Sequence, residues 1–222
     1  MSKAEILGSI RRGLKRGEPT HTQRAAVAAR LTPHGHNLIP KRALLPHQEQ
    51  VSLFTAMAIE AAAEIVELES EASIVEAVKP WLKEQHIDTL TIASDAQLDT
   101  LDWEGSQLQV QTGTAHVGDA ASLTVAFAGI AETGTLMLHS SKESPTTLNF
   151  LPDNHIVVLH KRNIVGPYEE AWKKLREATK SIMPRTVNLI TGPSRSADIE
   201  QRLQMGAHGP KRLLILLVSD SK

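Results

Sequence analysis

Two short stretches of the sequence combine residue types that can do chemistry with glycines that allow tight turns. In the first, AETGT, Glu132 is followed by Thr133, Gly134 and Thr135 between two expected strands. A partly desolvated carboxylate has a raised pKa and can act as a base or a nucleophile. An ordinary turn with threonines as strand formers explains the same pattern about equally well. Glu132 is therefore a candidate catalytic residue, and the three residues after it are candidate substrate-binding residues.

The second stretch is ITGPSRSADIE, where an expected strand ends at Gly192 and a helix is expected to begin near Ser194 or Ser196. The first N–H groups of a helix have no intrahelical partners and favour an anion. Arg195 opposes the dipole of such a helix, so helix chemistry does not explain it. Two interpretations stay open: Arg195 binds an anion beside the free N–H groups, or it bridges to an acid such as Glu132.

Histidines offer weaker candidates. His208 lies in the Gly-Pro turn before the last expected strand, where a structural role is the more common one, although such a residue can titrate near neutrality. His139 and His155 lie near strand ends and carry less weight. His34 and His36 are close together, but no carboxylate or cysteine stands at metal-ligand spacing, so no metal site is predicted.

An alternation of helix and strand patterns must position these residues. It predicts an α/β fold with a single open, mixed or mostly parallel sheet flanked by helices. The last strand-helix-strand unit is expected to be a right-handed parallel crossover. The expected helices span residues 50–65, 72–85 (interrupted near Pro80), 168–183 and 197–206, and the expected strands span residues 88–94, 108–113, 122–129, 133–140, 155–160, 186–191 and 211–218.

The N-terminal part differs from this domain. Residues 2–16 have apolar residues at helical spacing behind Ser2, which predicts a short amphipathic helix. Residues 17–47 contain four prolines and four histidines and are expected to form a linker or wrapping segment rather than a regular element. The sequence thus predicts a basic arm over residues 1–47 and an α/β domain over residues 48–222.

Charge is distributed unevenly along a chain whose total is −1. The first 48 residues carry a net charge of +7 and residues 49–108 carry −11, so we expect these two segments to attract each other. The arm contains no aromatic residue that could stack on bases, which argues against a nucleic-acid partner. The longest apolar run, Leu213 to Val218, is too short to span a bilayer, and the start lacks the apolar core of a signal peptide. A cytoplasmic protein without a membrane partner is expected.

The 222 residues include no cysteine, so the chain cannot hold a thiolate zinc site or a cysteine-ligated iron–sulfur cluster. No G-x-G-x-x-G motif follows an expected strand, and no P-loop pattern occurs. Nicotinamide and nucleoside triphosphate chemistry are therefore unsupported. The sequence predicts no cofactor in this chain.

Four ordered motifs carry a family resemblance: AETGTLML, LPDNHIVVL, ITGPSRSADIE and GAHGPKRLLILLV. Over roughly residues 50–222 the chain resembles the LUD-domain family, in particular its lactate-utilization protein C branch (LutC/YkgG-like). The resemblance implies a role in the bacterial oxidation of L-lactate to pyruvate, with iron–sulfur clusters only on LutA-like and LutB-like partner proteins. It also implies a fold similar to the NagB/RpiA/CoA transferase-like proteins.

The sequence departs from the family in one place. Members often carry an arginine a few residues before the LP of LPDNHIVVL, whereas Pro145, Thr146 and Thr147 occupy that region here. If that arginine normally pairs with an anion, this chain uses Lys142, Arg195 or another cation. CoA transferases of the related fold use a glutamate in a Glu-x-Gly context, and ETG is similar in that respect.

Three functions remain open: a non-redox component of an L-lactate oxidising assembly, a stand-alone enzyme acting on a carboxylate or phosphate ligand, and a metabolite-binding regulatory protein. Strand ends with special turn residues tend to converge on one rim of an α/β domain. We therefore expect the AETGT junction to face Gly192, Ser194 and Arg195 across one pocket for a carboxylate or phosphate, with His208 at its margin.

Overall fold

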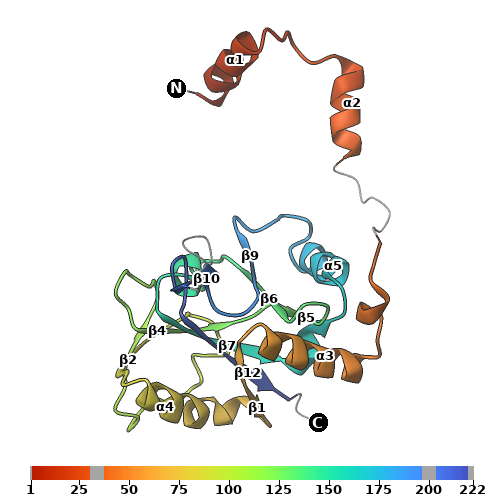
Figure 1. Cartoon of the computed structure of the whole chain (residues 1–222). Helices are drawn as coiled ribbons and strands as arrows, with labels where there is room; N and C mark the ends of the chain where they lie inside the picture. The colour runs from red at the N-terminus through yellow and green to blue at the C-terminus, as the bar shows by residue number, and fades with distance from the viewer. Residues whose placement is uncertain (1, 31–37, 197–203, 220–222) are drawn as a thin grey trace. The chain divides into compact units, whose positions relative to one another are not determined.

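The computed structural model describes residues 2–30, 38–196 and 204–219 (Figure 1). The chain divides into two compact units, residues 1–38 and 39–222. The first unit contains helix α1 (Lys3–Gly13) and helix α2 (His21–Ala29). As predicted, Ser2 caps α1: its hydroxyl accepts from the Glu5 N–H, and Glu5 accepts from the Ser2 N–H.

Helix α2 was not expected, because the prolines and histidines of residues 17–47 indicated an irregular segment. Thr20 and Gln23 form a second capping box, which satisfies N–H groups at the start of the helix. The body of the helix, QRAAVAA, is rich in alanine, the best helix former. Local capping and propensity therefore outweigh the average composition of the segment. His34 and His36 lie outside the described residues.

The unit of residues 39–222 contains three helices and twelve strands among its described residues. These are α3 (His47–Glu60), β1 (Glu64–Leu68), α4 (Ile74–Glu84), β2 (Thr89–Ile92), β3 (Gln109–Thr112), β4 (Ala121–Val125), β5 (Ala128–Ile130), β6 (Thr135–His139), β7 (Asn154–His160), β8 (Ile164–Val165), α5 (Tyr168–Ala178), β9 (Val187–Ile190), β10 (Arg195–Ser196), β11 (Gln204–Met205) and β12 (Arg212–Val218).

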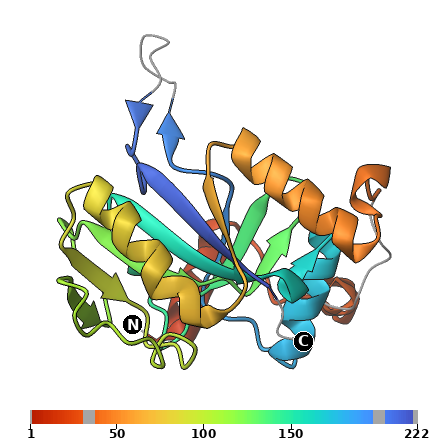
Figure 2. The same ribbon diagram turned by 90° about the horizontal axis from the view of Figure 1, so that it is seen from below.

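A six-stranded parallel sheet forms the centre of this unit, with strand order β1-β12-β7-β4-β2-β3. Alternate residues of its strands face opposite sides. In β12, Leu214 and Leu216 join the cluster that includes α4, whereas Ile215 and Leu217 join the cluster that includes α3. Helices α3 and α4 therefore cover opposite faces of the sheet (Figure 2). None of the helices that the structure describes is long and apolar enough to cross a membrane.

A second, four-stranded sheet has the order β8-β5-β6-β9. One of its faces contributes Leu136 and Leu138 to the α3 cluster, and the other packs Ile130 and Met137 against α5. The prediction of a single sheet is therefore wrong, although the α/β class is correct. The expected strand 122–129 divides into β4 and β5, which belong to different sheets.

The last part of the chain differs most from expectation. Strand β9 pairs antiparallel with β6 in the small sheet, whereas β12 lies in the large sheet, so the two do not form a parallel crossover in one sheet. A helix start at Ser194 is wrong, because the next residues form β10, which pairs antiparallel with β11. Residues 197–203 of the expected helix lie outside the described residues, and its last part contains β11.

Two further differences are local. Helix α3 ends at Glu60, and Ala62 adopts a φ of 68°, so that β1 begins where the helix was expected to continue. Pro80 does not interrupt α4, because Val78 and Leu82 on either side of it are fully buried and hold the helix against the large sheet. Tertiary packing thus overrides the helix-breaking tendency of proline.

Candidate functional site

The AETGT and ITGPSR junctions lie side by side at one end of the small sheet. Strands β6 and β9 run antiparallel with Leu136 opposite Ile190, so the start of β6 meets the end of β9. The hydroxyl oxygens of Thr135 and Thr191 are 2.6 Å apart. The two stretches singled out in the sequence are therefore neighbours in the structure.

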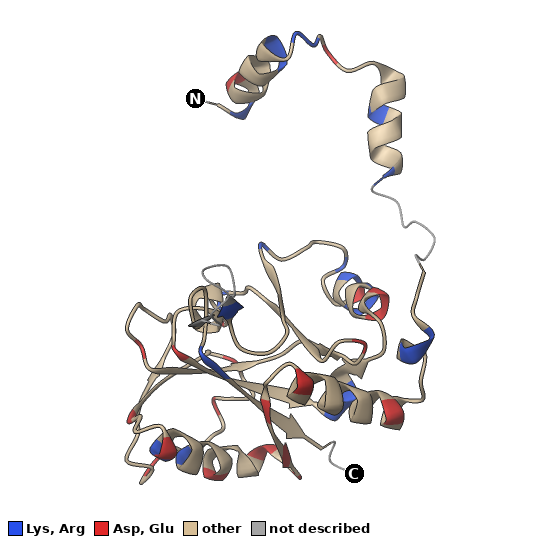
Figure 3. Cartoon of the chain, viewed as in Figure 1, with Lys and Arg blue, Asp and Glu red and all other residues tan. Residues whose placement is uncertain are grey.

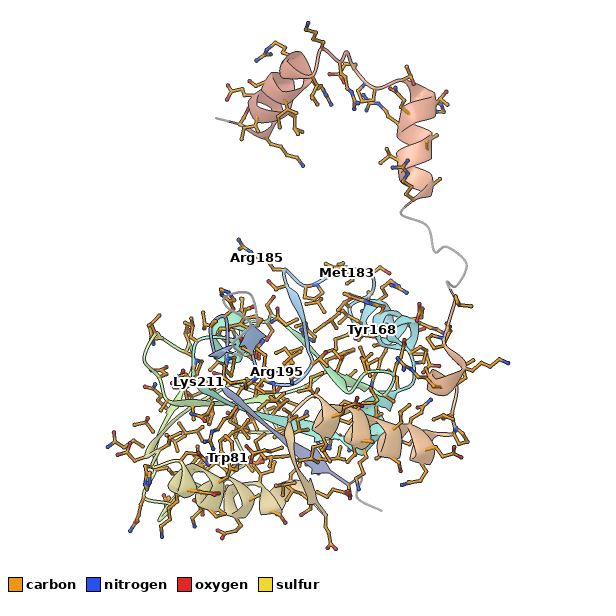
Figure 4. The ribbon with its side chains drawn as sticks, in the orientation of Figure 1. Trp81, Tyr168, Met183, Arg185, Arg195 and Lys211 are labelled. Carbon is orange, nitrogen blue, oxygen red and sulfur yellow. The ribbon has the colours of Figure 1, made fainter. Side chains whose placement is uncertain are left out.

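Four hydroxyl groups meet at this junction, and we call them the hydroxyl cluster: those of Thr133, Thr135, Tyr168 and Thr191. The Tyr168 hydroxyl lies 2.8 Å from that of Thr133 and 3.0 Å from that of Thr135, and the two threonine hydroxyls are 2.7 Å apart. Tyr168 is the first residue of α5 and is labelled in Figure 4. The cluster therefore links β6, β9 and α5 through one set of hydrogen bonds.

Both glycines of the two junctions pack against the C-terminal half of α3. A Cβ on Gly134 would lie 2.3 Å from the Ala58 nitrogen, and a Cβ on Gly192 would lie 2.0 Å from the Ala61 carbonyl oxygen. Both residues also have positive φ, 65° and 68° respectively, which favours glycine. These glycines thus bring the AETGT and ITGPSR junctions to the same helix end.

Arg195 contacts that helix end as well (Figure 4). Its Nη2 donates to the carbonyl oxygen of Ala61, the C-cap residue of α3, at 2.9 Å. A cation at a helix C-terminus interacts favourably with the helix dipole and satisfies a carbonyl that has no intrahelical partner. This contact is a structural bridge, to a carbonyl group rather than to an acid.

Glu132 is half-buried at the start of the junction. Its backbone N–H donates to the Gly166 carbonyl at 3.1 Å, which fixes the chain beside the N-terminus of α5. Within the described part of the chain, its carboxylate makes neither a hydrogen bond nor an ion pair. The carboxylate is therefore available to a ligand.

Gly192, Ser194 and His208 line a cavity of about 210 Å³. Thr191, Asn149 and His155 also line it. The Ser194 N–H donates to the Pro210 carbonyl at 2.8 Å, and its hydroxyl accepts from the His208 N–H at 3.3 Å. Ser194 therefore bonds to the segment before β12 instead of having the expected role as a helix cap.

The cavity does not include every residue expected in the site. Glu132, Thr133, Gly134, Thr135 and Arg195 are absent from its described lining. Thr191 connects the two groups, since it lines the cavity and bonds to Thr135. The structure thus brings the two junctions together but places their side chains in two adjoining sites.

His155 is the buried titratable residue of the cavity. It is fully buried on β7, and its Nε2 lies 2.8 Å from the Thr124 hydroxyl. Burial lowers its pKa to about 3, so the imidazole is neutral at physiological pH. Sequence reasoning gave His155 little weight and missed Asn149. The signal for His155 was its place in the motif LPDNHIVVL, at the start of a strand that lies in the middle of the large sheet.

No group of three or more His, Asp or Glu residues able to hold a metal ion occurs among the described residues.

The comparisons with known proteins agree with the fold. A family model described as LUD domain matches residues 51–218. A crystal structure of a DUF162 family protein from Deinococcus radiodurans has a TM-score of 0.60 and 21% identity, and the match covers 78% of this chain and 99% of that one.

Several named proteins are similar in sequence. The uncharacterized protein YkgG of Escherichia coli (strain K12) is 27% identical over 99% of both chains. Lactate utilization protein C of Bacillus subtilis (strain 168) is 36% identical over 54% of this chain and 55% of that protein, and the protein of the same name from Geobacillus thermodenitrificans (strain NG80-2) is 33% identical over 54% of each. The alignment thus spans about half the length of these two relatives. Because the family model covers both junctions and both sheets, the chain belongs to the LUD-domain family.

Proposed function

We propose that this protein is the non-redox component of a bacterial L-lactate utilization system. The observation that carries the proposal is the LUD-domain match over residues 51–218, together with relatives named Lactate utilization protein C. Oxidation of L-lactate to pyruvate removes two electrons and two protons. A chain without cysteine cannot hold a cysteine-ligated cluster to accept those electrons. The electrons would therefore pass to LutA-like and LutB-like iron–sulfur partners.

Within that system, the two adjoining sites would bind a small anionic ligand. In this proposal, Glu132 polarises or deprotonates the ligand, and Thr133 and Thr135 orient it through the hydroxyl cluster, with Gly134 allowing the turn. Gly192, Ser194 and His208 would line the adjoining cavity. The Arg195 contact with Ala61 supports a positioning role for this arginine, because it holds the ITGPSR junction against α3.

Reconstitution tests the proposed role. The purified chain and its two iron–sulfur partners, mixed together, should reduce an artificial electron acceptor in an L-lactate-dependent manner. The partners without this chain should be much slower, and this chain alone should transfer no electrons. Full activity of the partners alone, or L-lactate-dependent reduction by the isolated chain, would contradict the proposal. Co-purification of the three proteins from the native cell is an independent measurement.

A second candidate is a stand-alone enzyme on a carboxylate or phosphate ligand. The half-buried Glu132 carboxylate, which has no partner among the described residues, favours it. Turnover of such a ligand without partner proteins, lost in Glu132→Gln with binding retained, would support this candidate. Ligand binding without any turnover, alone or with partners, would instead indicate a regulatory protein.

A further inference from the structure

A second cavity, of about 220 Å³, lies at the carboxyl edge of the six-stranded sheet and contains none of the residues singled out above for the two junctions. Asp95 and Gln97 follow β2, Phe127 follows β4 and Asn163 follows β7. Helix α5 adds Lys174. In open parallel α/β sheets, ligands bind outside the carboxyl ends of the strands. The position of this cavity is thus the one that the large sheet favours for a ligand.

Lys174 gives the cavity a cation whose charge is incompletely neutralised. Its Nζ donates to the Asn163 side-chain oxygen at 2.8 Å and lies 5.6 Å from the centre of the Phe127 ring. No carboxylate of the described residues lies within 4.0 Å of this nitrogen. Burial lowers the pKa of Lys174, and the charge of Arg162 lowers it further. A partly desolvated ammonium group without an anionic partner is suited to an anionic ligand.

Neutral groups of the cavity retain hydrogen-bonding capacity. The Gln97 side-chain oxygen lies 2.8 Å from the His160 Nε2, and the amide nitrogen of the same side chain has no described partner. The Nδ1 atom of His139 is buried and has no hydrogen-bond partner in the described structure. The Ser141 hydroxyl accepts from the N–H groups of Glu143 and Ser144, so its own hydrogen remains available to donate. The cavity can therefore orient oxygen atoms of a ligand as well as its charge.

The volume of the cavity and the carboxylate of Asp95 restrict the class of ligand. Sites for drug-sized ligands are typically ~300–1,000 Å³, so a cavity of about 220 Å³ fits a molecule of few heavy atoms. Val125, Ala126 and the Phe127 ring provide an apolar wall for a short alkyl group. Asp95 adds an acceptor, one of whose oxygens already accepts from the Gln97 N–H at 3.0 Å. Its other oxygen can accept a hydrogen bond from a donor on the ligand.

We propose that this cavity binds a small 2-hydroxy carboxylate, with the ligand carboxylate on the Lys174 ammonium group and the ligand hydroxyl donating to Asp95. A hydroxyl group can donate a hydrogen bond to Asp95, whereas the keto oxygen of a 2-oxo acid cannot. The anion site rests on the geometry of the cavity. The choice of a 2-hydroxy acid also rests on the proposed role in L-lactate utilization.

Calorimetric titration of the full chain with L-lactate tests the proposal. L-lactate should bind at least tenfold more tightly than lactamide, its neutral analogue, and at least threefold more tightly than pyruvate or inorganic phosphate. Lys174→Met should weaken L-lactate binding at least tenfold. Lys173→Met is the matched control: this neighbouring lysine is exposed and 4.0 Å from Glu177, and its loss should change affinity less than twofold.

Several outcomes would overturn the proposal. The proposal is wrong if L-lactate shows no detectable binding, or if lactamide binds as tightly as L-lactate. It is also wrong if pyruvate or phosphate binds at least as tightly as L-lactate, or if Lys174→Met leaves the affinity for L-lactate unchanged. Thermal unfolding establishes that this variant is folded. Amide chemical shifts of the wild-type chain give a readout that needs no variant: L-lactate should shift Gln97 and Phe127, and shifts confined to Gly192 and His208 would place the ligand in the other cavity and reject the proposal.

The reconstitution described above keeps this proposal separable from the proposed function. If the three-protein mixture oxidises L-lactate but the isolated chain binds none, the cavity assignment fails and the assembly role stands. If the chain binds L-lactate through Lys174 but the partners are fully active without it, the assembly role fails and the binding site stands.

Discussion

At the residue scale, His155 couples the stability of the domain to pH. Its folded-state pKa is about 3, because burial disfavours the charged form, whereas a histidine in the unfolded chain titrates near pH 6.5. Between these values the unfolded chain binds a proton that the folded protein does not, so stability falls as the pH falls through this window. From pH 7 to pH 5 the loss from this group is roughly 2 kcal/mol.

Urea unfolding at several pH values measures this loss. His155→Gln should reduce the pH dependence of the free energy of unfolding between pH 7 and pH 5. His116→Gln is the control, because His116 is exposed and should leave the wild-type slope unchanged. Equal slopes for wild type and His155→Gln would contradict the prediction.

The hydroxyl cluster gives a second prediction at this scale. Thr135 is fully buried, and its hydroxyl is within hydrogen-bonding distance of three others. Thr135→Val keeps the shape but removes that hydroxyl, and each lost hydrogen bond costs about 0.5–1.5 kcal/mol. We expect a loss of about 1–3 kcal/mol in the free energy of unfolding, measured in urea. Thr112→Val, at an exposed position of β3, should change stability by less than 0.5 kcal/mol, roughly the usual range for surface changes. Equal stabilities of the two variants would show that the cluster adds nothing.

At the element scale, the end of α3 holds both junctions in place. Gly134→Ala would push a methyl group to within 2.3 Å of the Ala58 nitrogen, so α3 or the AETGT junction must move. Gly105→Ala is the matched control: Gly105 has a similar φ of 71°, but its added methyl group would have no neighbouring atom within 4 Å. The control isolates backbone strain, which costs about 1–2 kcal/mol for a left-handed residue.

Urea unfolding should show a clearly larger loss of stability in Gly134→Ala than in Gly105→Ala, and the near-ultraviolet spectrum should report the shift of neighbouring aromatic side chains. Similar losses in both variants would mean that the contact between α3 and the junction contributes little. The same comparison applies to Gly192→Ala, whose methyl group would lie 2.0 Å from the Ala61 oxygen.

At the scale of the whole molecule, the N-terminal unit and the α/β unit differ in charge. The helices α1 and α2 carry no acidic residue except Glu5, whereas acidic residues stand on α3 and α4 (Figure 3). The residues of all three hydrophobic clusters lie within 39–222. Deletion of residues 1–38 should therefore leave the α/β unit folded. The deletion must stop before Ala43, because this fully buried residue contacts Gly166.

The charge difference predicts a second effect of the same deletion. If the basic segment is attracted to acidic surface within one chain or between copies, the truncated protein should have a lower melting temperature or a later elution volume at low salt. Added salt should reduce the difference, because it screens exposed charges. Size-exclusion chromatography and thermal unfolding measure both. An unchanged melting temperature together with an elution volume that reflects only the lost mass would reject this attraction.

Elements with a local signal could be predicted from the amino-acid sequence. The apolar runs that end in His160 and Val218 predicted β7 and β12, and the spacing behind Ser2 predicted α1. The motif residues also indicated that the AETGT and ITGPSR junctions approach each other, as the bond between Thr135 and Thr191 shows. The elements depend on periodicity, capping and turn residues, which neighbouring positions fix, whereas the approach of the two junctions depends on the pairing of β6 with β9.

The pairing of those elements depends on long-range contacts, which local sequence patterns do not specify. The hydrophobic pattern of β9 would be the same in an antiparallel pair with β6 and in a parallel sheet with β12. Hydrophobic periodicity does not specify the partner strand. Lys174 has the pattern of an ordinary helix-surface residue, and only the packing of α5 beside Phe127 and Asn163 places its ammonium group in a cavity. Long-range contacts assigned the strands to two sheets, and that assignment positions the candidate sites.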